Sequence, residues 1–206
     1  MDSRLSKILN EVYEFGQDHD SKTEDRTKRM LNITPDTGLF LSIVIRAVGA
    51  KKVLEVGTSN GYSTIWIADA LRQQRGKVLS VEASPEKVAM AKKNIQLAGL
   101  ADFVDWRHGD ARTVLRKLPS NSFDVVFMDA ERPQYVSYWD DIDRVLKPGG
   151  VLLVDNALEP RPEELVGFFA EIKDTGRYLS EVLSVGKGEY LAFKLEGAKR
   201  TGRRQS

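Results

Sequence analysis

The chain has 206 residues, of which 41% are apolar and 30% are charged, with a formal net charge of +1. These values are typical of one globular domain, and the balanced charge does not favour nucleic acid or a membrane as the main partner. No cysteine is present, which excludes disulfides, thiolate zinc sites and cysteine nucleophiles and favours a cytoplasmic location. Two histidines are too few for a histidine-rich metal site, residues 1–10 are too polar for a signal peptide, and no apolar run reaches the ~20 residues of a membrane helix.

Residues 1–50 are predicted to be mainly helical and to form a lid or dimer region. Apolar residues at helical spacing predict an amphipathic first helix; they are Leu5, Ile8, Leu9, Val12 and Phe15. Residues 17–28 are charged and lack a core pattern, so they form a loop, a lid or a second polar helix, and a solvated connector is favoured. Thr34 or Asp36 then caps a helix that Gly49 ends. The apolar residues of that helix are Leu39, Leu41, Ile43, Val44 and Val48.

Strands and helices then alternate five times. The predicted strands are 53–56, 77–82, 103–106, 123–128 and 151–154, and the predicted helices are 62–74, 85–98, 111–118, 135–146 and 162–172, with a turn at 147–150. This alternation predicts an α/β fold, in which helices cover both faces of a parallel sheet. Strands at 178–184 and 189–195 flank a glycine turn, which predicts an antiparallel hairpin at the sheet edge. Residues 1–196 are therefore predicted to form one domain, and the basic residues 197–206 a disordered tail.

The first predicted strand leads into a turn that contains two glycines. Glu55 lies near the end of the strand, and Gly57 and Gly61 leave the backbone free to bend and to let a ligand come close. The Gly-x-x-x-Gly spacing differs from the Gly-x-Gly-x-x-Gly of dinucleotide-binding enzymes. A ligand without phosphate, such as S-adenosylmethionine, needs no phosphate cradle. Its cationic sulfonium suits a carboxylate at this end of the sheet, where open α/β sheets bind ligands.

Four predicted strands end in a carboxylate: Glu55, Glu82, Asp129 and Asp155. The carboxyl ends of parallel strands lie along one edge of the sheet, and buried acids are costly unless a cation or a hydrogen-bond donor lies beside them. Glu82 is placed to accept hydrogen bonds from a ribose, and Gly109-Asp110-Ala111 is placed to border an adenine ring. Asp129, Asp155 and Asn156 offer hard oxygen ligands, which suit magnesium or calcium rather than zinc.

Taken together, these segments resemble the cation-dependent O-methyltransferase family, which contains catechol and caffeoyl-coenzyme A O-methyltransferases and small bacterial relatives. The resemblance runs from about residue 30 to residue 195. It is carried by residues 33–38, 53–63, 81–82, 109–111, 123–135 and 149–156. It implies a Rossmann-like class I methyltransferase fold, with a seven-stranded, mostly parallel sheet and an antiparallel C-terminal hairpin. It also implies S-adenosylmethionine as methyl donor and Mg²⁺ or another divalent cation.

The resemblance also implies roles for individual residues. The methionine and ribose side of the donor would be held by the Ile33 backbone, Glu55, Gly57, Thr58 and Ser63. Glu82 would bind the ribose, and Asp110 and Ala111 would flank the adenine. The metal ligands would be Asp129, Asp155 and Asn156, and the catalytic residues Asp129, near the amino group of the donor, and Arg132.

Two departures from the family pattern affect the acceptor side. The usual Asp-Ala-Asp-Lys is Asp129-Ala130-Glu131-Arg132 here. That lysine is often assigned as the base, and an arginine stays protonated and cannot replace it in that role. Arg132 is therefore predicted to stabilise a phenolate, with a surface salt bridge as the alternative. After Asn156 the family often has an aromatic residue and a long insertion, whereas residues 157–162 lead directly into a helix, which predicts a more open acceptor site.

The predicted function is methyl transfer to a metal-bound hydroxyl of a small catechol-like or phenolic acceptor. The alternative within the family is a tRNA hydroxyuridine O-methyltransferase, whose phosphates the basic tail would contact. A nicotinamide dehydrogenase is disfavoured because the third fingerprint glycine is missing, and a non-catalytic binding module remains a further alternative. A homodimer formed through the first helix and the edge hairpin is expected from the resemblance.

Overall fold

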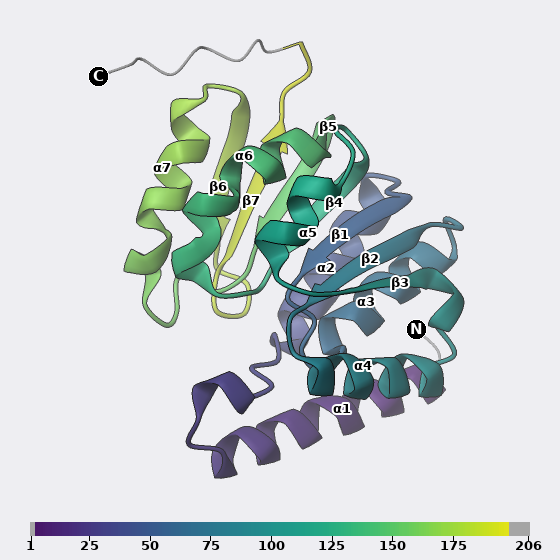
Figure 1. The fold of residues 1–206 in the computed structure, drawn as a ribbon. Helices are drawn as coiled ribbons and strands as arrows, with labels where there is room; N and C mark the ends of the chain where they lie inside the picture. Colours follow the sequence, from purple (N-terminus) through teal and green to yellow (C-terminus); the bar gives the residue numbers. More distant parts are fainter. Residues whose placement is uncertain (1–2, 198–206) are drawn as a thin grey trace.

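The computed structural model describes residues 3–197, and its centre is one seven-stranded sheet (Figure 1). The strands are β1 (Lys52–Val56), β2 (Lys77–Glu82), β3 (Val104–His108), β4 (Phe123–Met128), β5 (Leu146–Val154), β6 (Tyr178–Leu183) and β7 (Glu189–Lys194). Their order across the sheet is β3-β2-β1-β4-β5-β7-β6. Only β7 runs antiparallel to its neighbours, β5 and β6. The predicted Rossmann-like sheet with a C-terminal hairpin is confirmed.

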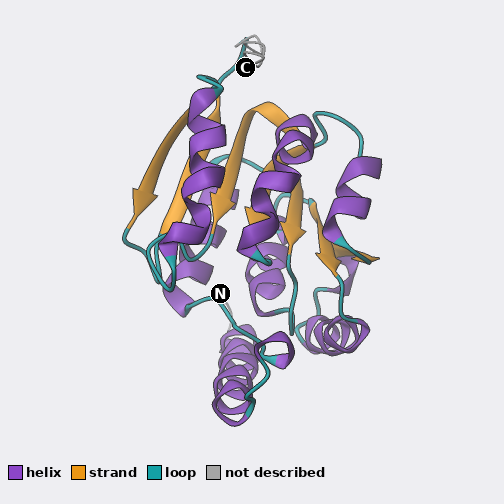
Figure 2. Cartoon of the chain, turned by 60° about the vertical axis from the view of Figure 1, so that its left-hand side comes forward, coloured by secondary structure: helices purple, strands orange, loops and turns teal. Residues whose placement is uncertain are grey.

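Helices cover both faces of the sheet (Figure 2). They are α1 (Ser3–Lys22), α2 (Pro35–Ala47), α3 (Tyr62–Arg72), α4 (Pro85–Leu97), α5 (Ala111–Lys117), α6 (Tyr135–Val145) and α7 (Val166–Asp174), with short 3-10 turns η1 (Arg26–Lys28), η2 (Ala101–Phe103), η3 (Arg132–Gln134) and η4 (Pro162–Leu165). Successive strand residues face opposite layers: Val53 packs with α2 and α3, and Leu54 packs with α6. Within residues 3–197, no helix has both the length and the apolar character needed to cross a bilayer.

Local chemistry explains where the helices begin. The Thr34 hydroxyl accepts a hydrogen bond from the backbone N–H of Thr37 and caps α2, and Ser84 caps α4 in the same way. In both helices a proline occupies the first turn, where its missing N–H costs nothing. Asp110 caps α5. The caps of α4 and α5 fix those helix starts just after β2 and β3, and the start of α2 lies against Gly186 in the turn between β6 and β7.

The structure differs from the sequence-based expectation in three places. The charged stretch at 17–28 is not one connector, because α1 continues to Lys22 and η1 follows. Residues 147–150 lie within β5, where a shift of register against β4 accommodates the extra residues. On α2 the buried side chains include Leu41 and Ile45, whereas Leu39, Ile43 and Val48 are exposed. The predicted disordered tail falls, except for Gly197, outside the described residues.

A buried group of charges fastens the C-terminal hairpin to α6. Asp143 forms ion pairs with Arg177 (2.6 Å) and Lys194 (3.2 Å), and it accepts a hydrogen bond from the Tyr178 hydroxyl (2.8 Å). Burial opposes ionisation of Asp143, but the hydrogen bonds from Arg177 and Tyr178 and the charge of Lys194 outweigh it and hold the pKa of Asp143 below its ordinary value. The hairpin therefore depends on this carboxylate being ionised.

Asp143→Ala is expected to lower the free energy of unfolding by about 3–5 kcal/mol, because it leaves two buried cations without their carboxylate. Urea unfolding at pH 7 measures the loss, and the exposed Asp174→Ala on α7 is the control, with a change within about 0.5 kcal/mol. A group with a depressed pKa stabilises the fold above its unfolded pKa of about 3.9, so the difference should shrink as the pH falls below about 4. A loss below about 1 kcal/mol at pH 7 would contradict this account.

Candidate active site

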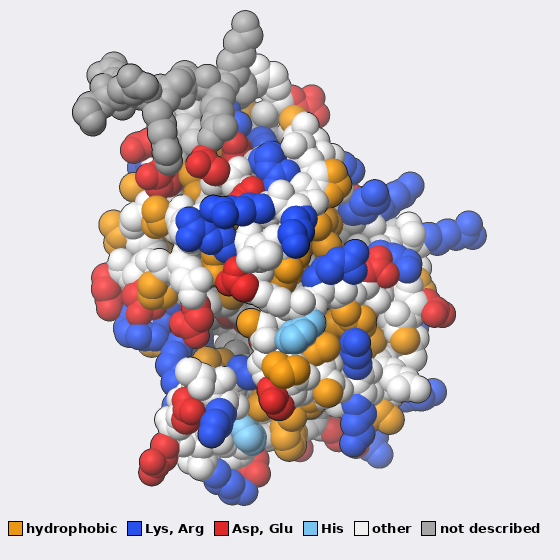
Figure 3. Space-filling model, viewed as in Figure 1, with side chains coloured by type: hydrophobic (Ala, Val, Ile, Leu, Met, Phe, Trp, Pro, Cys, Tyr) orange, Lys and Arg blue, Asp and Glu red, His pale blue; other side chains and the backbone are white. Residues whose placement is uncertain are grey.

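A cleft of about 260 Å³ lies between the carboxyl ends of β1, β2, β4 and β5 and the segment 26–33 that follows α1. The surface is hollowed there, between the N-terminal layer and the body of the domain (Figure 3). Ten of the predicted site residues line the cleft: Ile33, Gly57, Thr58, Ser63, Glu82, Asp110, Ala111, Asp129, Arg132 and Asn156. Two others, Glu55 and Asp155, are buried and are not among its lining residues.

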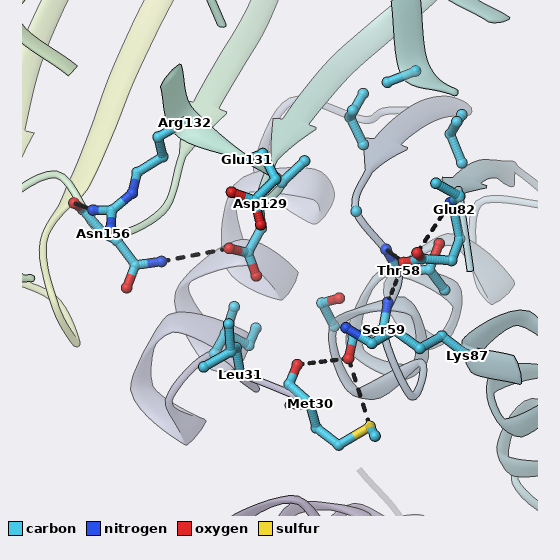
Figure 4. A pocket seen from close by; sticks show the side chains of 18 of the residues that line it. Met30, Leu31, Thr58, Ser59, Glu82, Lys87, Asp129, Glu131, Arg132 and Asn156 are labelled. Carbon is cyan, nitrogen blue, oxygen red and sulfur yellow. Dashed lines mark hydrogen bonds between the residues drawn. The ribbon is translucent and has the colours of Figure 1, made fainter. Parts of the chain in front are cut away.

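Glu82 holds the glycine turn in place. One carboxylate oxygen accepts hydrogen bonds from the backbone N–H groups of Thr58 (3.1 Å) and Ser59 (2.9 Å), as Figure 4 shows. The other accepts from the N–H groups of Ala83 (3.0 Å) and Ser84 (2.9 Å). The same side chain lines the cleft, so its carboxylate borders the space where a ligand would bind. The turn between β1 and α3 is therefore shaped before any ligand binds.

Gly57 brings the two halves of the cleft together. Its φ is 99°, which an L side chain rarely adopts, and a Cβ there would collide with the carbonyl oxygen of Asp129. The Asp129 N–H donates to the Val56 carbonyl (2.9 Å), which aligns the end of β4 with that of β1. No other residue type could bring the glycine turn this close to Asp129.

Glu55 points into the protein, beneath the cleft. Its carboxylate accepts hydrogen bonds from the hydroxyls of Ser63 (2.6 Å), Thr64 (2.6 Å) and Ser80 (2.5 Å). Burial raises the pKa of Glu55 to about 7, although the three hydroxyl donors oppose that rise. The predicted contact between Glu55 and the donor stays a prediction, whereas Ser63, which donates to Glu55, lines the cleft itself.

Asp110 and Ala111, which were predicted to flank the adenine, lie where α5 begins. Asp110 accepts hydrogen bonds from both the backbone N–H (2.9 Å) and the hydroxyl (3.0 Å) of Thr113. The preceding Gly109 donates its N–H to the Glu82 carbonyl (2.9 Å). This arrangement holds β3 and the start of α5 beside Glu82, so the two residues predicted for the adenine border the same wall as the residue predicted for the ribose.

Asp129, Asp155 and Asn156 meet at the other end of the cleft. The Asn156 side-chain amide donates to Asp155 (2.6 Å) and to Asp129 (3.4 Å), and Figure 4 shows it directed at Asp129. Burial, and then the charges of Asp155 and Glu55, raise the pKa of Asp129 well above its ordinary value. Burial also raises the pKa of Asp155. Two acids that resist ionisation therefore share one amide donor.

A further acid, Glu189 at the start of β7, adjoins this group and was not singled out from the sequence. It accepts a hydrogen bond from the Thr37 hydroxyl (2.9 Å) and forms a hydrogen bond with Asp155. Burial, and then the charge of Asp155, raise the pKa of Glu189 to about 11. Burial and the charge of Asp155 therefore favour the protonated form of Glu189.

Arg132 is buried and holds the loop after β5. Its Nε forms an ion pair with Glu164 (3.1 Å), and its terminal nitrogen donates to the carbonyls of Asn156 (3.3 Å) and Pro160. Figure 4 shows the guanidinium beside the Asn156 backbone. These contacts are made by a buried guanidinium, so Arg132 does not form the surface salt bridge that was the alternative. Its predicted role toward a phenolate stays a prediction.

The segment that covers the cleft falls within the predicted lid region, but the contacts that hold it were not predicted. Asp20 accepts the backbone N–H groups of Met30 (2.6 Å) and Leu31 (2.8 Å), and the Ser59 hydroxyl donates to the Met30 carbonyl. Leu31 has a φ of 51° and Ser59 a φ of 50°, both left-handed. Because these contacts join residues distant in the chain, no local pattern indicates them.

The fold and the cleft define a Rossmann-like methyltransferase domain, and the comparisons name its family. The model of the O-methyltransferase family matches residues 4–194, so the chain belongs to that family. It is similar to a catechol O-methyltransferase of Niastella koreensis, 37% identical over 131 residues, which are 62% of this chain and 59% of that protein. The chain thus matches little more than half the length of this curated relative.

Two solved structures share the fold over nearly their whole length. An O-methyltransferase from Bacillus cereus, in complex with SAH, superposes with a TM-score of 0.79 and 28% identity, covering 91% of this chain and 90% of that one. The O-methyltransferase TomG of Streptomyces achromogenes, involved in tomaymycin synthesis and in complex with SAM, gives a TM-score of 0.76 and 27% identity, covering 95% and 91%.

Glu55→Gln is expected to remove a pH dependence of stability. Between the unfolded pKa near 4.5 and the folded value of about 7, the folded state retains a proton that the unfolded state has lost, so the free energy of unfolding falls as the pH rises, by an amount on the order of 3 kcal/mol. Urea unfolding of the wild type and the variant from pH 5 to pH 8 measures the difference. Parallel curves would contradict the buried, protonated Glu55.

Proposed function

We propose that the protein transfers a methyl group from S-adenosylmethionine to a hydroxyl of a small phenolic, catechol-like acceptor. The observation that carries the proposal is the single cleft, which joins the turn held by Glu82 to the oxygen-rich group around Asp129 across Gly57. Membership of the O-methyltransferase family and the SAM and SAH complexes of similar structures support it.

The donor would occupy the half of the cleft formed by the glycine turn. Glu82 is the acceptor for the ribose hydroxyls, and Asp110 and Ala111 border the adenine. The Ile33 backbone, Gly57, Thr58 and Ser63 surround the methionine portion, with Glu55 acting through Ser63. Asp129 lies at the junction of the two halves, where a carboxylate attracts both the donor's amino group and its sulfonium charge.

The acceptor half has donor atoms that fit a hard dication. The carboxylates of Asp129 and Asp155 both accept a hydrogen bond from the side-chain amide of Asn156, and rotating that amide by 180° presents its carbonyl oxygen instead. Among residues 3–197 no three His, Cys, Asp or Glu side chains form a metal cluster, so the asparagine is required as the third ligand. A dication bound there would supply positive charge that favours ionisation of the acceptor hydroxyl.

The contribution of the chain itself is alignment. The acceptor oxygen forms the new O–C bond as the S–C bond breaks, and the electron pair of that bond neutralises the sulfonium. Gly57 keeps the two binding halves adjacent, so the methyl group and the oxygen are held within attacking distance, which accounts for a large part of the barrier reduction.

Asp155→Ala is expected to lower the rate of methyl transfer by roughly 100-fold or more while changing donor affinity only a few-fold, because Asp155 lies on the acceptor side. Isothermal titration with S-adenosylmethionine measures affinity, and labelled donor with a catechol panel measures transfer.

Chelator should abolish transfer, and Mg²⁺ should restore it. Full activity in exhaustive chelator would disprove the metal role, and the exposed Asp174→Ala serves as control.

The same assay decides the alternative acceptor. A tRNA substrate would give methyl transfer to bulk tRNA but not to catechols, with binding that weakens steeply as salt rises. No observation on residues 3–197 favours tRNA, since most of the basic tail lies outside them.

We infer that two copies associate through the apolar face of the C-terminal hairpin. Leu179 and Phe193 are paired in register and are 63% and 40% exposed, and Leu39 and Ile43 on α2 are 52% and 55% exposed. On β5, Val151 pairs with Phe193 and belongs to the core that includes α2, so the hairpin face continues from the α2 side. The first helix, predicted to share this interface, contributes only Phe15 as an exposed large apolar residue.

Ile43→Glu combined with Phe193→Glu is expected to convert a dimer to a monomer, because two charges would be buried at the interface. Sedimentation equilibrium measures the mass, and Leu97→Glu, an exposed apolar position on α4, is the control. A wild type that is monomeric at about 100 μM would rule out this interface as a stable one.

A further inference from the structure

The acceptor half of the cleft has a second cation besides Arg132. The guanidinium of Arg132 is fixed by Glu164 and by two loop carbonyls, so it cannot follow an acceptor that enters or leaves. Lys187, in the turn between β6 and β7, lines the same cleft from another wall. Within residues 3–197 its ammonium makes no hydrogen bond or ion pair, which leaves all three N–H donors available.

The turn that carries Lys187 is held tightly on both sides. Gly186 and Gly188 have φ values of 55° and 94°, so both are left-handed. A Cβ on Gly186 would collide with the hydroxyls of Thr34 and Thr37, and one on Gly188 would come within 2.6 Å of Leu158. The turn is thus wedged between the start of α2 and the loop after β5.

Backbone hydrogen bonds fix the same turn to the loop after β5. The carbonyl of Lys187 accepts from the N–H groups of Leu158 (3.1 Å) and Glu159 (2.9 Å), and that of Gly188 accepts from Ala157 (2.8 Å). Gly188 also donates to Val185 across the turn (2.8 Å). The backbone of Lys187 is therefore fixed, whereas its side chain is exposed and free to move.

The charge of Lys187 acts on the acceptor half. It lowers the pKa of Asp129 and of Asp155, and in both cases its effect exceeds that of Arg132. A cation with this reach favours negative charge on a ligand oxygen placed beside Asp129 and Asn156. Because its backbone is fixed and its side chain is free to move, the ammonium group can follow an acceptor oxygen as the acceptor enters.

We propose that Lys187 binds the ionised hydroxyl oxygen of the acceptor through its ammonium group, and so extends methyl transfer to acceptors whose hydroxyl is less readily ionised. The inference rests on the proposed function and adds to it a residue that touches the substrate. The hydroxyl proton leaves to solvent as the acceptor enters the cleft. Arg132 then has the separate task of holding the loop after β5, at Pro160, and η4, at Glu164.

The test uses 4-nitrocatechol, whose absorption changes on ionisation, bound to the full-length protein with S-adenosylhomocysteine and magnesium chloride. Lys187→Met is expected to weaken binding of the nitrocatecholate about tenfold and to raise the pKa of the bound nitrocatechol by about one unit, as loss of a charged hydrogen bond predicts. Lys187→Arg should retain most of the affinity. The exposed Lys173→Met on α7 is the control and should match the wild type.

Equal binding by wild type and Lys187→Met, or a Lys187→Arg variant as weak as Lys187→Met, would overturn the inference, as would a wild type that binds no nitrocatecholate. Methyl transfer is read separately, with the same protein preparations and with S-adenosylmethionine in place of S-adenosylhomocysteine. Binding that depends on Lys187 without any transfer would refute the proposed function and leave the inference standing. The loss in transfer rate for Lys187→Met should be larger for catechol than for nitrocatechol, whereas a merely structural role predicts equal losses.

Discussion

The approach of Gly57 to the carbonyl oxygen of Asp129 is the constraint on which the site depends. β1 and β4 are neighbours in the sheet, and the chain leaves β1 through a left-handed residue without a side chain. Because nothing occupies that space, the turn held by Glu82 and the acidic group around Asp129 form walls of one cleft rather than two separate surfaces. The proposed methyl transfer requires this adjacency, because the donor and the acceptor must lie side by side.

The acids along the sheet edge differ in the work they do. Glu82 accepts four backbone N–H groups and organises a loop, whereas Glu55 is enclosed by three hydroxyls below the surface. Asp129 and Asp155 have no cation of the protein in direct contact among the described residues, and burial raises both of their pKa values. This unbalanced pair costs stability, as sites prepared for a charged ligand often do.

Much of this arrangement could be predicted because it is local in sequence. Continuous apolar runs predicted the strands, Thr34 was one of two residues predicted to cap α2, and the strand ends predicted the acids. The sheet order brings those acids together by topology alone. The direction of each side chain was harder to predict. Side chains alternate between the two faces of a strand, and that of Glu55 points beneath the cleft rather than into it.

The parts that sequence reasoning missed depend on contacts between distant segments. Asp20 holds the segment at Met30, Glu189 reaches Asp155, and Lys187 reaches the cleft from the last hairpin. None of these residues has a neighbour in sequence that signals its role. The exposed residues of α2 were misread for a related reason: helical spacing identifies an apolar face but not what covers it.

In the turn formed by Gly186, Lys187 and Gly188, the residues that pack against the fold differ from the residue whose side chain faces the cleft. Gly186 and Gly188 carry the packing, and the residue between them contributes only its backbone to the fold. Exchanging the side chain at this one position therefore alters the chemistry offered to an incoming molecule without disturbing the core. A single substitution at the tip of this hairpin can therefore change which acceptors the cleft binds, while the free energy of unfolding stays nearly constant.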